Sequence, residues 1–226
     1  MKTLLTLLTC LLILSPNVVM SETVKWDDLV KRGGLYYKKF TSIPFTGEVT
    51  GKRQGSLKYG KPENRWEAYH ENGQLKSLVH FEYGKPNGSF ENYYENGQIK
   101  TRGYLKDGVR GNGLWEFYHK NGQLKTKGNY KNGFPDDGLW DSYHENGQLS
   151  SRTKYKNGKK HGSSMSYHKN GRLRTKGTYK NGKEDGTWVN YRIGGQLASE
   201  VPYKDGQIDG PWVTYYDNGQ LQSKGT

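Results

Sequence analysis

The hydrophobic and polar positions of this chain recur with a period of 24 or 25 residues. In a typical period, an alternating run from Gly113 to Tyr118 leads into Asn121-Gly122, and a second alternating run follows. Alternation with a period of two is typical of a β-strand with one covered face, and Asn-Gly between two such runs is the strongest short-range signal for a hairpin with a type I′ turn. The sequence therefore predicts tandem β-hairpins that turn at Asn-Gly.

This unit occurs seven times, with its second turn glycine at positions 73, 97, 122, 147, 171, 195 and 219. An aromatic residue stands seven positions before that glycine in every copy except the fifth, which has Ser164. A tyrosine stands four positions before it, and leucine or isoleucine two positions after it, in all copies. Such spacing is the signature of a repeat architecture. The two longer periods should place their extra residue between hairpins, near 109–112 and 134–137, where insertion costs least.

A two-residue turn would fix both the register and the faces of each hairpin. In the third unit it predicts the opposite pairs Trp115 and Gly128, Tyr118 and Lys125, and His119 and Leu124. One face, the tryptophan face, would carry the tryptophan, the leucine and a later aromatic residue. The residue opposite the aromatic position is small or β-branched in every unit, and where it is a glycine, as at Gly128 opposite Trp115, the ring would cover it. The other, the tyrosine face, would carry the tyrosines and a set of basic residues. Its candidate partner-binding residues are Tyr93, Lys100, Arg102, Tyr118, Lys125, Lys127, Tyr143, Arg152, Tyr167, Arg174 and Lys176.

The predicted fold class is all-β, an elongated single-layer antiparallel sheet of tandem β-hairpin repeats. Residues 57–226 contain the seven repeats, and residues 22–56 are expected to form an atypical N-terminal cap, because an end unit must cover an apolar edge that internal units share. Within the cap, we expect a short helical turn at 26–30, a strand at 35–37 and a turn at 44–47 that leads into a strand ending near Gly51.

The repeated motif, as in the segment from Tyr167 to Lys183, resembles MORN repeats and is similar to the bacterial variant grouped as the YwqK-like antitoxin family. The resemblance implies an elongated antiparallel sheet and a non-enzymatic interaction role. Relatives in that group are often labelled toxin-neutralising, and other MORN proteins have been linked to membrane lipids. An export signal would conflict with neutralising a cytoplasmic toxin.

Residues 1–21 have the pattern of a signal peptide, with Lys2, an apolar run from Leu4 to Leu14, and small residues before Glu22. We therefore expect a periplasmic or secreted protein. A lipoprotein anchored at Cys10 is disfavoured, because the apolar run continues beyond that residue. No cysteine follows the expected cut, which excludes disulfides and thiol chemistry from the mature chain, and no later stretch is long enough to span a bilayer.

Composition narrows the function classes. Only 31% of the residues are hydrophobic, which argues against a thick core, and the net charge of +13 favours anionic partners. Four histidines occupy one repeat position, but equivalent positions lie roughly 10 Å apart by strand spacing, too far to share one metal ion. The glycine-rich loops lack the features of a phosphate-binding loop. We therefore expect no metal, no cofactor and no enzymatic activity. The four histidines are His70, His119, His144 and His168.

Two functions remain in view. The first is an exported scaffold that binds another protein, in the manner of an antitoxin or immunity protein. The second is peripheral binding of anionic lipid or lipopolysaccharide through the basic tyrosine face. Nucleic-acid binding also combines aromatic residues with cations, but export argues against it.

Overall fold

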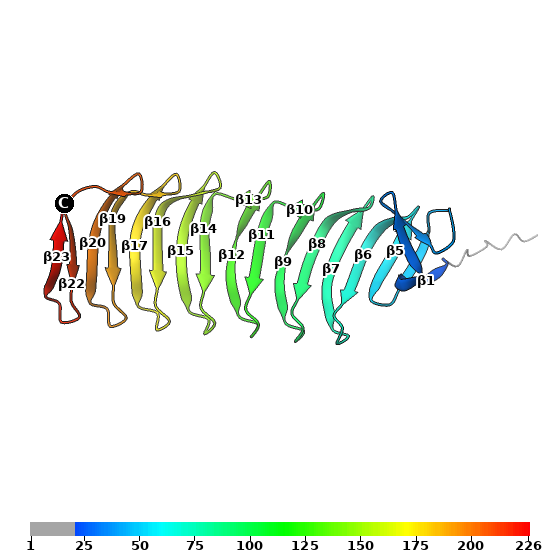
Figure 1. Cartoon of the computed structure of the whole chain (residues 1–226), viewed down its shortest axis with the longest axis horizontal. Helices are drawn as coiled ribbons and strands as arrows, with labels where there is room; N and C mark the ends of the chain where they lie inside the picture. Colours follow the sequence, from blue (N-terminus) through cyan, green and yellow to red (C-terminus); the bar gives the residue numbers. More distant parts are fainter. Residues whose placement is uncertain (1–20) are drawn as a thin grey trace, which may run out of the picture.

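The computed structural model describes residues 21–226, and the predicted fold class is confirmed. Twenty-one strands form one sheet, and two further strands form a separate hairpin. Figure 1 shows successive strands lying side by side along one long ribbon, with the cap at one end and β23 at the other. The signal peptide and the lipoprotein alternative at Cys10 were predicted in a segment that, apart from Ser21, lies outside the described residues.

The cap consists of β1 (Thr23–Lys25), the 3-10 turn η1 (Trp26–Asp28) and the hairpin β2 (Leu29–Arg32) and β3 (Leu35–Lys38), followed by β4 (Gly47–Thr50) and β5 (Arg53–Lys58). β1 pairs in parallel with β4, and β5 joins β4 to the first repeat. The strand at 35–37 and the strand ending near Gly51 are present. The expected helical turn is also present, but it ends at Asp28, because Leu29 and Val30 begin β2.

Seven hairpins follow the cap. In chain order, their paired strands are β6 (Lys61–Tyr69) and β7 (Leu75–Glu82), β8 (Lys85–Tyr93) and β9 (Ile99–Lys106), β11 (Gly113–Tyr118) and β12 (Leu124–Lys131), β14 (Gly138–Tyr143) and β15 (Leu149–Lys156), β16 (Lys159–Tyr167) and β17 (Leu173–Lys180), β19 (Gly186–Tyr191) and β20 (Leu197–Lys204), and β22 (Trp212–Tyr215) and β23 (Leu221–Gly225). Short strands precede four of them: β10 (Val109–Arg110), β13 (Phe134–Pro135), β18 (Lys183–Glu184) and β21 (Gln207–Ile208). The breaks after β10 and β13 lie where the extra residues were expected.

The Asn-Gly tips do not form the predicted type I′ turns. Gly122 has a φ of 84°, but Asn121 is not in the left-handed region. The Gly122 N–H donates to the carbonyl of His119 at 3.0 Å, and the His119 N–H donates to the carbonyl of Gln123 at 2.8 Å. This is a three-residue loop, a type I turn followed by a left-handed glycine. The Asn121 side chain adds a hydrogen bond to this loop, because its Oδ1 accepts the Gln123 N–H at 3.0 Å. The Gly194-Gly195 tip forms the same loop without an asparagine.

Type I′ turns occur instead along the opposite long edge of the ribbon, between hairpins. There, Asn132 and Gly133 have φ values of 52° and 83°, and the flanking Lys131 and Phe134 form a pair. We call this edge the lysine rim, defined by the seven turns at 58–61, 82–85, 106–109, 131–134, 156–159, 180–183 and 204–207. The central two residues of all seven turns have positive φ.

The tip geometry also corrects the predicted register. Trp115 pairs with Gly128 as expected, but a register shift follows Phe117, so that Tyr118 pairs with Leu124 and Lys125 has no partner. The predicted opposite pairs of Tyr118 with Lys125 and of His119 with Leu124 are therefore wrong. Residues directly opposite each other share a face, which places the leucine on the tyrosine face and not, as predicted, with the tryptophan.

Tryptophans cover glycines, but Trp115, Trp140 and Trp188 each cover a glycine of the preceding hairpin. In the last hairpin, Trp212 lies against Gly225, the glycine opposite it, as predicted. A Cβ added at Gly103 would lie 2.3 Å from the ring of Trp115, and one at Gly128 would lie 2.2 Å from the ring of Trp140. The predicted cover of Gly128 by Trp115 is thus wrong by one hairpin. Because the rings of Trp115, Trp140 and Trp188 span the seam between units, they pack adjacent hairpins together. Trp115 is only 1% exposed.

The cap supplies a second layer at one end of the ribbon. Phe45, Val49, Leu57 and Trp66 form a buried cluster, and Trp26 packs against it together with Leu29 and Tyr36 from the β2–β3 region. The face that internal repeats leave thinly covered is thus covered at this end by a small core.

Candidate interaction face

The tyrosine face carries a transverse row of charged residues. Glu116 pairs across the sheet with Arg102 on one side and Lys127 on the other, and Lys127 in turn pairs with Asp141. Adjacent members of the row therefore alternate in charge. We call the row the charge ladder, consisting of Glu91, Arg102, Glu116, Lys127, Asp141 and Arg152.

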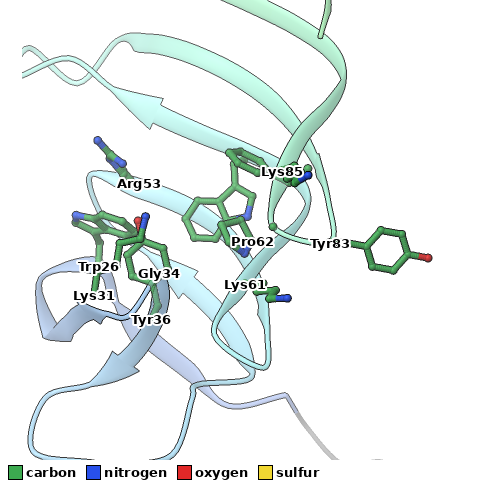
Figure 2. Close-up of a pocket in the computed structure, with 12 residues that line it drawn as sticks. Trp26, Lys31, Gly34, Tyr36, Arg53, Lys61, Pro62, Tyr83 and Lys85 are labelled. Atoms are coloured by element: carbon green, nitrogen blue, oxygen red, sulfur yellow. The ribbon is translucent and has the colours of Figure 1, made fainter. Parts of the chain in front are cut away.

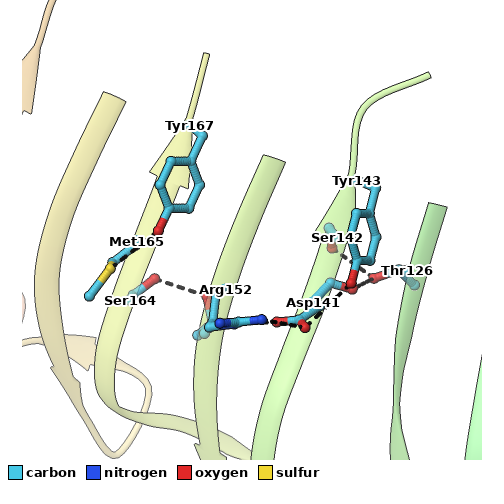
Figure 3. Close-up of polar contacts among 9 residues, drawn as sticks. Thr126, Asp141, Ser142, Tyr143, Arg152, Ser164, Met165 and Tyr167 are labelled. Carbon is cyan, nitrogen blue, oxygen red and sulfur yellow. Dashed lines mark hydrogen bonds and ion pairs between the residues drawn. The ribbon is translucent and has the colours of Figure 1, made fainter. Parts of the chain in front are cut away.

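Asp141 and Arg152 form the best-defined pair of the ladder (Figure 3). Arg152 Nε lies 2.7 Å from Asp141 Oδ1, and Nη2 lies 2.9 Å from Oδ2, so the contact is bidentate. Asp141 is 8% exposed. The hydrogen-bonded guanidinium holds the pKa of Asp141 below its ordinary value and raises the pKa of Arg152. Arg102 and Glu116 form a second ion pair of the ladder, between adjacent hairpins, through a single contact from Nε to Oε2.

The tyrosines contact the same carboxylates. The hydroxyls of Tyr69 and Tyr93 donate to Glu67 and Glu91, each two residues earlier in the same strand. Burial, with a further contribution from the Glu91 hydrogen bond, raises the pKa of Tyr93 to about 12. Burial also raises the pKa of Tyr118. The hydroxyls therefore stay protonated at neutral pH and remain hydrogen-bond donors.

Eight of the eleven predicted residues share this face: Tyr93, Arg102, Tyr118, Lys127, Tyr143, Arg152, Tyr167 and Lys176. Cations lie over tyrosine rings of the following repeat, with Arg102 5.7 Å from the ring centroid of Tyr118 and Lys176 5.9 Å from that of Tyr191. These contacts support the expected juxtaposition of tyrosine and cation.

Lys100, Lys125 and Arg174 do not join the row. Each is the unpaired residue at a register shift, where strand alternation is interrupted. Lys100 Nζ lies 5.5 Å from the ring of Tyr94, which occupies the tip position held by histidine in other repeats. The sequence pattern gave no sign of this bulge.

Three residues of the ladder were missed by the sequence prediction: Glu91, Glu116 and Asp141. Their signal was a carboxylate two positions before the repeat tyrosine. They make the middle of this face mixed in charge, so the prediction of a simply basic face is wrong there.

The ladder ends after Arg152. The carboxylate position is occupied by Met165, Val189 and Val213 in the last three repeats. Lys176 consequently pairs with Met165 on one side and Val189 on the other. Figure 3 shows the change, since Tyr143 points to Asp141 whereas Tyr167 points to the sulfur of Met165.

The four repeat histidines have a structural contact. Nε2 of His119 lies 3.0 Å from the carbonyl of Tyr143 in the next repeat, and His70, His144 and His168 make the same contact. Where histidine is replaced, Tyr94 and Arg192 still donate to that carbonyl position. Asparagines form a parallel series, as when Asn121 Nδ2 donates to the carbonyl of Glu145 at 2.8 Å. Within residues 21–226, no three potential metal ligands cluster.

The model of the MORN repeat variant matches residues 62–83, 86–107, 112–132, 136–157, 160–181 and 208–226, which together make up more than half of the chain. The chain belongs to the MORN repeat variant family. MORN repeats commonly act as scaffolds that bind proteins or lipids and are generally non-enzymatic. The family model does not match the segment between 181 and 208, although the β19–β20 hairpin there has the same register shift as the others.

No curated protein matches the chain. Throughout residues 21–226, the MORN ribbon contains no helix with the length and apolar character needed to cross a bilayer.

Proposed function

We propose that this MORN protein is an exported, non-enzymatic scaffold that binds another protein through its tyrosine face. The observation that carries the proposal is the charge ladder beneath the tyrosine row. Aromatic residues and arginine are enriched at protein interfaces, and alternating charges offer complementarity to a partner with its own charge pattern. Because Glu91, Glu116 and Asp141 offset the charge of the neighbouring cations, this row offers little net attraction to a uniformly anionic surface.

Export of the scaffold rests on the signal-like pattern of residues 1–21. The partner is then a secreted or envelope protein, and a toxin neutralised outside the cytoplasm is the class that the family resemblance suggests. Mass spectrometry of the protein from its native host tests this point, with a mature chain beginning at Glu22 as the expected result and a full-length chain starting at Met1 as the contrary one.

Site-specific photo-crosslinking in native cells tests the interaction face. A crosslinker at Tyr167 should capture one discrete partner, whereas one at Ser166, the preceding residue on the tryptophan face, should not. Tyr118→Ala combined with Tyr143→Ala should reduce capture at least tenfold. Equal capture from both faces, or capture unaffected by the double substitution, would rule out the tyrosine face.

One observation favours a second function, the binding of anionic lipid or lipopolysaccharide. The seven turns of the lysine rim contain ten lysines and only three carboxylates. The seven tips, each counted as the three-residue loop with one flanking residue on either side, as in 119–123, contain four cations (Lys or Arg) and four carboxylates. Tyr59, Tyr83 and Phe134 are more than two-thirds exposed along the lysine rim. Cations beside exposed aromatic side chains suit a membrane interface. The relevant surface is then this rim and not the tyrosine face.

Vesicle co-sedimentation separates the two functions. If lipid is bound, vesicles containing phosphatidylglycerol should retain the protein at low salt, and retention should fall steeply as salt rises. Replacing the four lysines of the 156–159 and 180–183 turns by glutamine should abolish retention, while the matched Lys127→Gln on the tyrosine face should preserve it. Equal retention by phosphatidylcholine vesicles would exclude this function.

A further inference from the structure

An aromatic cavity of about 470 Å³ lies where the cap meets the first repeat (Figure 2). It is separate from the tyrosine face, because Trp66 belongs to the tryptophan row. Its walls come from η1, the β2–β3 hairpin, β5, β6, the end of β7 and the turn that precedes β8. The volume is in the range of small-molecule sites.

Rings form a corner in this cavity. The centroids of Trp26 and Tyr36 are 5.3 Å apart with planes inclined at 55°, and those of Trp26 and Trp66 are 6.0 Å apart with planes inclined at 78°. No two of these rings are parallel, so they do not form the slot between two faces that would sandwich a nucleobase. Aromatic rings that meet at an angle suit a puckered, saturated ring, because such a ring presents C–H groups in more than one direction.

Four cations line the same cavity, namely Lys31, Arg53, Lys61 and Lys85, and its lining includes no carboxylate. Arg53 lies 4.8 Å from the ring of Trp26, and Lys31 lies 5.3 Å from that of Tyr36. Lys85 is 3.7 Å from Asp107, but across residues 21–226 no ion pair involves the other three cations. In Figure 2, Lys31 lies near Trp26 on one side of the cavity, and Lys61 and Lys85 lie on the other.

A neighbouring cavity provides the contrast. It shares Trp26, Arg53 and Trp66 with the first but is also lined by Asp27 and Glu67. The side with four cations and no carboxylate is therefore the one whose charge selects an anion. Long-range attraction is strengthened in a concave site lined by one sign of charge.

We propose that this cap cavity binds a saccharide unit that carries a phosphate or carboxylate group. The sugar ring packs against the corner formed by Trp26 and Tyr36, and its anionic group contacts Arg53 and Lys61. This binding does not depend on the protein-binding function, because it uses the opposite face and the cap.

The indole N–H signals in an NMR spectrum of the full mature chain test the proposal. The protein has six tryptophans, each with one such signal, and only Trp26 and Trp66 line the cavity. Glucose 6-phosphate or glucuronate should move these two signals saturably while those of Trp188 and Trp212 stay fixed. The probe that binds more tightly shows whether the cavity prefers a phosphate or a carboxylate group.

Three ligand controls sharpen the assignment. Glucose should move neither signal, and inorganic phosphate should bind at least tenfold more weakly than the better sugar anion. Adenosine monophosphate should also bind more weakly. Tighter binding of the nucleotide, or equal binding of glucose, would overturn the saccharide assignment.

Two variants test the cations. Arg53→Gln and Lys61→Gln should each weaken sugar-anion binding at least tenfold. Lys156→Gln with Lys159→Gln, in a turn that lies four turns along the lysine rim from Lys61, should leave it unchanged. Dispersed indole signals would verify that each variant is folded, and Lys61→Gln removes no ring contact. Unchanged affinity in a folded Lys61→Gln protein, or uniform movement of all six indole signals, would refute the site.

Discussion

The middle of the ribbon, β8 to β15, and its C-terminal part, β16 to β23, differ on both faces. The middle carries the charge ladder on one face and, on the other, a chain of ring contacts from Phe90 through Trp115 to Tyr155, with centroids 5.1 to 6.0 Å apart. Both features stop at the same hairpin, where Ser164 replaces the tryptophan and Met165 replaces the carboxylate. Because neighbouring residues in a strand face opposite sides, a change in two consecutive residues alters both faces together.

The comparison teaches that a regular backbone ladder does not imply uniform stability. All seven hairpins share the same turn and register shift, but only those in the middle add the cross-strand ion pairs of the charge ladder and continuous ring packing. The C-terminal part has an ion pair between Arg192 and Asp217, which joins neighbouring tips and not the strands. In a repeat protein, each unit is stabilised mainly by its neighbours. We therefore expect amide hydrogen exchange to be slower in β11 to β15 than in β19 to β23.

The largest effect should come from the tryptophans. Trp115→Ala removes a side chain that is 1% exposed and packs against Phe90, Phe117 and Tyr130, so it should cost about 3–5 kcal/mol of unfolding free energy. Trp188→Ala, in the C-terminal part, removes a half-buried ring and should cost about 2 kcal/mol. Urea denaturation measures both. Equal losses would break the proposed distinction between the two regions.

A smaller effect is expected from the ladder itself. Asp141→Asn removes the bidentate contact with Arg152, and because the arginine side chain is 46% exposed, we expect a loss of about 1–2 kcal/mol. Glu200→Gln is the matched change in the C-terminal part, where Glu200 lies between Val189 and Val213, and it should cost less than about 0.5 kcal/mol. Hydrogen exchange at the amides of β14 and β15 provides the local measurement.

The same pair predicts a pH dependence confined to the middle. Since Arg152 lowers the pKa of Asp141 in the folded protein, the pair stabilises the protein fully above the ordinary carboxyl pKa, about 3.9, and this contribution is lost as pH falls through the lowered pKa. The stability difference between wild type and Asp141→Asn should be constant from about pH 5 to 8 and shrink below about pH 4. A difference that grows on acidification would contradict the assigned pair.

The smallest change extends the ladder into the C-terminal part. Met165 lies between Arg152 and Lys176, and Tyr167 already points to its side chain. Met165→Glu should therefore restore the contacts found in the middle repeats and stabilise the protein by about 0.2–1 kcal/mol, an effect that weakens in high salt. Met165→Gln is the uncharged control. A glutamate variant less stable than the glutamine variant would argue against the ladder as a stabilising feature.

Much of the fold followed from the repeat spacing, because period and alternation determine where strands begin and which residues face together. The split between tryptophans and tyrosines was predictable for that reason. The spacing could not show whether the residues around Asn121-Gly122 form a two-residue turn or a three-residue loop followed by a bulge. Both arrangements use the same number of residues. The tips form the three-residue loop even at Gly194-Gly195, which lacks the asparagine, and the accompanying bulge moved Lys125 out of the row.

The site was predicted only in part for a related physical reason. The cations stood out because the chain is basic, but their effect depends on neighbours in adjacent strands. Pairing places Glu116 between Arg102 and Lys127, which neutralises a surface that the sequence counted as positive. The cap cavity was not foreseen, because it joins Trp26 and Trp66 from segments with different patterns.

The hydrogen bonds at the tips run from each hairpin to the next and no farther, as from Asn121 to Glu145 and from His119 to Tyr143. A duplicated unit inserted into the array would therefore find matching donors and acceptors on both sides. This makes length a property that evolution can change by copying whole units, without redesigning those already present.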